Sequence, residues 1–196
     1  MPRNNTVVCD SWQTLARHQV LPPRGGRRVW LAFWLLLLAP LAAHGMDDAF
    51  RVGIAVGQHW DEDATLIRGS LLHPLPWSTD GFRSLAELSA GRHRVRGGGE
   101  VMWGTAARIL LRVDLGTERL FLELGTGGTY YDSDSLDGKE WASRWQFRSS
   151  AGLGARIGGT GAVAIVYRAS HSSNGGFRSP NPGLDEHSLA LEVGFR

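Results

Sequence analysis

"ERLFLELGT", residues 118–126, is the segment that most clearly indicates how this chain folds. Successive side chains of an extended strand point to opposite faces, so Leu120, Leu122 and Leu124 share one face. Phe121 and Glu123 share the other face. The segment therefore predicts a β-strand with one aliphatic face and one face of mixed polarity.

Runs of the same kind recur after residue 46, with clusters of Gly, Asp, Ser and Pro between them. No stretch in this part of the chain shows a long helical periodicity. We predict eight strands, at residues 50–59, 63–71, 82–92, 101–113, 118–130, 145–157, 162–172 and 186–196. The fold class is therefore all-β, and its polar faces point either to water or into a lumen.

Three properties favour a transmembrane barrel over a soluble β-sandwich, which is the alternative. Tilted strands of about ten residues can span a bilayer. The faces opposite the aliphatic ones combine charged residues with many Gly, which suits a narrow lumen. Aromatic residues lie near the ends of the runs, as in membrane-interface girdles: Trp60, Trp77, Trp103, Trp141, Trp145, Tyr130 and Tyr131. We predict an eight-stranded antiparallel transmembrane β-barrel.

The N-terminal region has the pattern of a secretory signal peptide with an unusually long basic n-region. "RGGRR" at 24–28 precedes the apolar run at 29–43, and Ala43 and Gly45 occupy the −3 and −1 positions of a cut before Met46. A cut after Ala43 is the alternative. A membrane anchor would need about 20 apolar residues, and Pro40 interrupts this run. We predict a removed signal at 1–45 and the barrel at 46–196.

Charge and cysteine content exclude several classes of function. Residues 1–45 carry five Arg and one Asp, a net charge of +4, so the rest of the chain carries −2 of the overall +2. Nucleic-acid binding is therefore not expected. Cys9 lies in the predicted signal, so the mature chain has no thiol nucleophile, disulfide or lipoprotein anchor.

Chemistry-bearing residues gather near the C-terminus. His171 and Ser173 lie two residues apart on a predicted strand, so they share a face, and this face continues the row of Ile165 and Tyr167. A Ser nucleophile needs a base at hydrogen-bond distance. Ser172 is a second serine, but it has the opposite parity and points into the barrel.

A catalytic His also needs a carboxylate that orients it. Asp185 and Glu186 are the candidates, and parity places Asp185 on the outer face and Glu186 on the inner face. Between His171 and these acids, the turn around Asn174, Gly176 and Asn181 supplies amide groups for an oxyanion hole. The alternative reading is an ordinary turn, because "SNGG" and "PNPG" favour turns for conformational reasons.

The segment "HSSNGGFRSPNPGLD", residues 171–185, resembles the C-terminal motif of the PagL-type lipid A deacylases. These are eight-stranded outer-membrane barrels that hydrolyse the ester-linked acyl chain at the 3 position of lipid A. The resemblance implies Ser173 as the nucleophile and His171 as the general base and acid, with Asn174, Gly176 and Asn181 in the oxyanion hole. The family's acidic residue is usually Glu, whereas this chain has Asp185 at the matching position and Glu186 as the alternative.

The resemblance also implies a setting: the outer membrane of a Gram-negative bacterium, with lipid A or lipopolysaccharide as substrate, membrane lipid as surroundings, and neither metal nor cofactor. Arg92, Arg94, Arg178 and His93 are candidates for contacts with lipopolysaccharide phosphates, although ordinary solvated charges explain them equally well. A non-enzymatic barrel, such as an adhesin or structural protein, and a barrel phospholipase are the alternative functions. The sequence leaves open whether the chain forms a homodimer.

Overall fold

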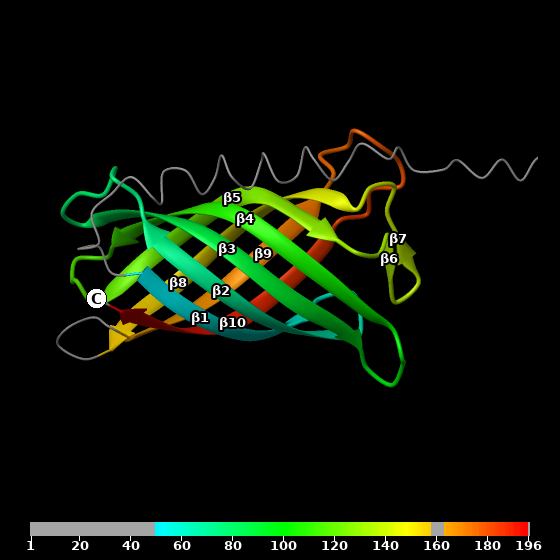
Figure 1. The fold of residues 1–196 in the computed structure, drawn as a ribbon, viewed down its shortest axis with the longest axis horizontal. Helices are drawn as coiled ribbons and strands as arrows, with labels where there is room; N and C mark the ends of the chain where they lie inside the picture. Colours follow the sequence, from blue (N-terminus) through cyan, green and yellow to red (C-terminus); the bar gives the residue numbers. More distant parts are fainter. Residues whose placement is uncertain (1–49, 158–162, 196) are drawn as a thin grey trace, which may run out of the picture. The chain divides into compact units, whose positions relative to one another are not determined.

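The computed structural model describes residues 50–157 and 163–195 (Figure 1). The predicted signal peptide and its cleavage sites lie outside the described residues. Within these residues, no helix is long and apolar enough to cross a membrane.

Eight antiparallel strands form a closed barrel, so the sandwich alternative is wrong. Each strand pairs with its neighbour in order around the barrel, and β1 pairs with β10 to close the sheet. The strands are β1 (Phe50–His59), β2 (Ala64–Pro74), β3 (Phe82–Val95), β4 (Val101–Asp114), β5 (Leu120–Tyr131), β8 (Trp145–Ile157), β9 (Val163–Ser173) and β10 (Leu184–Phe195). All eight predicted runs are strands, with ends that shift by up to three residues.

The connection between β5 and β8 is more ordered than a plain polar loop. It contains a short hairpin of β6 (Ser135–Leu136) and β7 (Lys139–Glu140). Figure 1 shows this hairpin and the β9–β10 connection at one end of the barrel, with the C-terminal end of β10 at the other end. The end with the hairpin is called the loop end below.

The alternation in β5 confirms the predicted faces. Leu124 is 59% exposed on the outer wall, whereas Glu123 is 1% exposed inside. Ile54, Leu122 and Leu189 are likewise exposed. An outer wall of aliphatic side chains around a polar interior is the arrangement of a membrane barrel and the reverse of a water-soluble sheet protein.

Ion pairs fill the lumen. Arg112 contacts both Glu123 and Glu192 at 2.7 Å, and Arg168 binds the same two carboxylates. Arg108 pairs with Glu87 nearby. Removing charges from water is costly unless they are paired, so this network is what makes a polar interior compatible with burial.

The aromatic prediction is only partly correct. Trp60, Trp77 and Trp103 are exposed, as a girdle requires, but Trp141 and Tyr131 are buried. Their rings lie 6.1 Å apart in a cluster with Leu136 at the loop end. The β5–β8 connection turns Trp141 inward, and strand parity does not apply to a residue outside the barrel strands.

Candidate active site

His171 and Asp185 face each other across β9 and β10. They are direct partners in the strand register, and His171 Nδ1 lies 2.7 Å from Asp185 Oδ1. Both side chains are partly exposed, whereas their neighbours in the chain, Ser172 and Glu186, are buried. The parity prediction is therefore confirmed for these four residues: two lie on the outer wall and two in the lumen.

The two acidic candidates have different surroundings. Glu186 receives two hydrogen bonds of 2.8 Å from Arg68 and a further one from Arg148 inside the barrel. Its carboxylate is on the opposite side of the sheet from the imidazole of His171. Asp185, and not Glu186, is thus the acid that contacts His171.

Ser173 shares the outer face with His171 but forms no hydrogen bond with it within the described part of the chain. Residues two apart on a strand have Cα atoms about 6.5–7 Å apart, so a contact depends on the side-chain rotamers. Catalytic hydrogen bonds are often long until substrate binds. Ser172 accepts a hydrogen bond from the Tyr131 hydroxyl at 3.3 Å inside the lumen, which separates it from His171.

The predicted oxyanion turn is held together by its own asparagines. The Asn174 amide donates to Asn181 Oδ1 at 2.9 Å, and the Gly176 amide donates to Asn174 Oδ1 at 3.0 Å. These two backbone donors are therefore already used within the turn. A backbone N–H can only donate, so Asn181 must turn its oxygen towards Asn174, which fixes the direction of Asn181 Nδ2. This side-chain amide forms no hydrogen bond within the described residues, so it is available to donate to a ligand.

Gly183 lies directly against the imidazole. Its φ is +75°, and a Cβ at this position would approach His171 Cε1 to 2.6 Å. A larger residue would therefore clash with the imidazole unless the ring or the turn moved. Gly183 is part of the segment 171–185, but the sequence does not reveal its contact with His171, which depends on the fold of the turn.

A depression of about 420 Å³ opens on the outer wall beside His171 and Asp185. Trp60 and the small residues Ser149, Ala151 and Ala169 line it. Ser149 is the strand partner of His171 on β8, just as Asp185 is its partner on β10. Ser173 is not among the residues that line the depression. Sequence reasoning missed Ser149, since a single sequence does not reveal which residues pair across strands.

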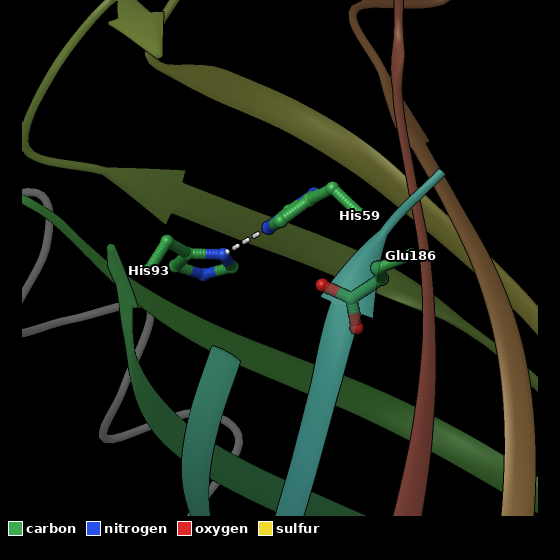
Figure 2. Close-up of side chains that lie close together, drawn as sticks. All are labelled: His59, His93 and Glu186. Carbon is green, nitrogen blue, oxygen red and sulfur yellow. Dashed lines mark hydrogen bonds between the residues drawn. The ribbon is translucent and has the colours of Figure 1, made fainter. Parts of the chain in front are cut away.

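A second group of polar residues lies inside the barrel at the loop end (Figure 2). His59 Nε2 and His93 Nδ1 are 2.8 Å apart, and Glu186 lies close enough to complete a set of three metal-type ligands. Arg68 and Arg148 already bind this carboxylate and compensate its charge, which disfavours a cation there. His93 is 1% exposed, so its proposed contact with lipopolysaccharide phosphates is wrong. Arg92, Arg94 and Arg178 are exposed.

The family model and the curated relative indicate the same family. A family model described as "Lipid A 3-O-deacylase (PagL)" matches residues 65–194. The lipid A deacylase PagL of Bordetella bronchiseptica is 38% identical over 119 residues, which are 61% of this chain and 57% of that protein. The matched region thus spans a little over half of this curated relative.

Two solved structures share the barrel fold. The crystal structure of the outer membrane enzyme PagL aligns with a TM-score of 0.57 at 22% identity, covering 73% of this chain and 98% of that one. The N-terminal β-barrel domain of Pseudomonas aeruginosa OprF aligns with a TM-score of 0.53 at 13% identity, covering 75% and 97%. At such identities the likeness concerns the fold.

Proposed function

Because the chain belongs to the lipid A 3-O-deacylase (PagL) family, we propose that it hydrolyses the ester-linked 3-O-acyl chain of lipid A. The single observation that supports this assignment best is the 2.7 Å contact between His171 and Asp185 on the outer wall, with Ser173 on the same face. This contact supports His171 as the base and Asp185 as its orienting carboxylate, on the side of the barrel that an insoluble lipid can reach.

Asp185 sets the protonation of the imidazole in the proposed mechanism. Its carboxylate accepts a hydrogen bond from His171 Nδ1–H, so Nε2 carries a lone pair and can act as a base. Nε2 removes the proton of Ser173 Oγ, and that oxygen attacks the ester carbonyl. The carbonyl oxygen becomes an oxyanion, to which Asn181 Nδ2 donates. One such donor is worth about 2.7–4 kcal/mol in a serine hydrolase.

His171 then returns the proton. It protonates the sugar oxygen as the ester bond breaks, which leaves the acyl chain on Ser173. Water attacks this acyl-enzyme with His171 again as the base, and the fatty acid and free Ser173 result. Each proton that His171 accepts is given to a leaving oxygen, so the cycle needs no other reactant.

The depression beside His171 is the proposed seat of the acyl chain. Small side chains at Ala151 and Ala169 leave space on the wall, while exposed Tyr167 and Leu153 follow in the same outward rows. An acyl chain that lies along this surface stays in contact with apolar atoms, as it does in a bilayer. This arrangement would place the ester near the membrane boundary at the loop end, where Arg92, Arg94 and Arg178 can meet lipid A phosphates.

We further propose that the barrel spans the outer membrane of a Gram-negative bacterium. The exposed aliphatic belt and the exposed Trp60, Trp77 and Trp103 support this location. The two longest connections between described barrel strands, β5–β8 and β9–β10, lie at the loop end, so the opposite end would face the periplasm.

Mass spectrometry of lipid A tests the proposal. Cells that produce the wild-type protein should lose one ester-linked acyl chain from lipid A, and cells that produce Ser173→Ala should not. If the lipid A is unchanged in cells that contain the folded wild-type protein, a non-enzymatic barrel is favoured. Hydrolysis of purified phospholipid, but not of purified lipid A, would instead favour a phospholipase.

A further inference from the structure

A second cavity of about 420 Å³ lies at the end of the barrel opposite the β9–β10 connection. Four arginines from four different strands line it: Arg51 of β1, Arg83 of β3, Arg112 of β4 and Arg156 of β8. Asp80 is the one carboxylate among the described lining residues. Glu123 and Glu192 compensate Arg112, and Asp114 compensates part of the charge of Arg156. Four arginines against the single lining carboxylate still favour an anion over a cation in this cavity.

Two of these guanidinium groups are held in fixed positions. Arg112 and Arg156 have their guanidinium carbons 4.7 and 4.6 Å from the centre of the buried Phe121 ring. Gly154 makes room for this ring, because a Cβ there would overlap it. Arg156 also donates from Nη1 to Asp114 at 2.8 Å and to the carbonyl oxygen of Glu118. The cationic wall of the cavity is thus formed before any ligand binds.

Arg156 retains an unused donor. Its Nη2 atom is buried and has no hydrogen-bond partner within the described residues, and the residue is only 8% exposed. An unsatisfied buried donor is costly, and the cost is greater for a charged group. A ligand oxygen that reached Nη2 would remove that cost.

We propose that this cavity binds a phosphoryl group, either inorganic phosphate or the phosphate of a lipid headgroup. A tetrahedral phosphoryl group can accept hydrogen bonds from several sides, which suits guanidinium groups that come from four strands. A planar carboxylate matches a single guanidinium group. The site is separate from the proposed deacylase centre, since the two lie at opposite ends of the barrel.

Titration of the folded barrel with inorganic phosphate tests the site. The protein is held in an uncharged detergent at low salt in a phosphate-free buffer, and binding is followed by calorimetry and by phosphorus NMR. Arg83→Gln removes an exposed lining charge and should weaken binding by roughly tenfold. Arg156→Lys keeps the charge but loses the planar guanidinium group that can donate two parallel hydrogen bonds, and it should also weaken binding. Arg178→Gln, an exposed arginine at the loop end, is the matched control and should bind like wild type.

A second arm separates the two sources of phosphate. A short-chain phosphatidylglycerol, kept below its micelle concentration, is titrated alone and in competition with phosphate. Tighter binding of the lipid assigns the site to a headgroup, and tighter binding of phosphate assigns it to the free anion. The proposal fails if wild type binds neither probe at millimolar concentration, or if Arg83→Gln and Arg178→Gln behave alike. Heat-modifiable gel migration verifies that every variant is folded.

Discussion

His171 and Asp185 occupy directly paired positions of β9 and β10 on the outer wall, with Nδ1 and Oδ1 2.7 Å apart. The next residue, Glu186, points into the lumen and binds Arg68 and Arg148. β10 thus carries two adjacent carboxylates that have different partners. Asp185 contacts the imidazole, whereas Glu186 compensates buried positive charge.

Substitution of each acid by its amide separates these roles. Asp185→Asn should lower kcat by about 10³–10⁴-fold, because the imidazole loses the group that fixes its tautomer, and the barrel should remain folded. Glu186→Gln should destabilise the barrel by about 3–5 kcal/mol, because Arg68 and Arg148 lose their buried partner. Thermal unfolding and the rate of lipid A deacylation measure the two effects. A fully stable but inactive Glu186→Gln would show that Glu186 is the catalytic acid.

The three serines around His171 give a second prediction. Ser173→Ala should lower activity by about 10⁴-fold or more, as expected for a nucleophile. Ser149 faces His171 from β8 and lines the depression, so Ser149→Ala should change kcat by less than about tenfold and act mainly on KM. Ser172→Ala should leave the kinetics unchanged, because Ser172 lies inside the lumen.

A covalent probe distinguishes the nucleophile from its neighbours directly. A lipid-like fluorophosphonate should label Ser173 in the wild-type enzyme, and peptide mapping by mass spectrometry identifies the site. Labelling of Ser149 instead would show that the nucleophile is Ser149 on β8. That outcome is chemically reasonable, since Ser149 is the strand partner of His171 and Ser173 is two residues along the same strand.

The alternation of side chains along the strands was sufficient to predict the barrel. It also placed Asp185 and Glu186 on opposite faces, because these two residues lie on a regular strand. It could not reveal Ser149 beside His171. That neighbour depends on the register between β8 and β9, which is a property of two strands together.

Irregular segments set the other limit of sequence reasoning. Trp141 lies outside the barrel strands. The hydrogen bond between Asn174 and Asn181 depends on the conformation of an irregular turn, in which side-chain directions follow no regular period. His93 was misassigned for a simpler reason. The β3 strand continues to Val95, so His93 keeps the strand parity and points into the lumen.

Gly183 provides a test of imidazole placement. Gly183→Ala combines backbone strain at φ +75° with a clash against His171. The rate of lipid A deacylation should therefore fall by much more than the loss of folded protein explains. Gly138→Ala is the control: its φ is +74°, but no atom lies within 4 Å of the added Cβ. Both variants should lose about 1–3 kcal/mol of stability. Equal activity of the two would mean that Gly183 serves the turn alone.

The depression on the outer wall gives the last prediction. Ala151→Leu places a larger aliphatic side chain in the space beside His171 without adding polarity or charge. If the acyl chain lies there, kcat/KM for lipid A should fall by roughly 10–200-fold. Hydrolysis of a short soluble ester should change little, because such a substrate does not reach along the wall. Ala107→Leu, on an outward position of β4, is the matched control and should behave like wild type with both substrates. An equal loss with both esters would place the effect on the catalytic residues and would argue against an acyl seat at Ala151.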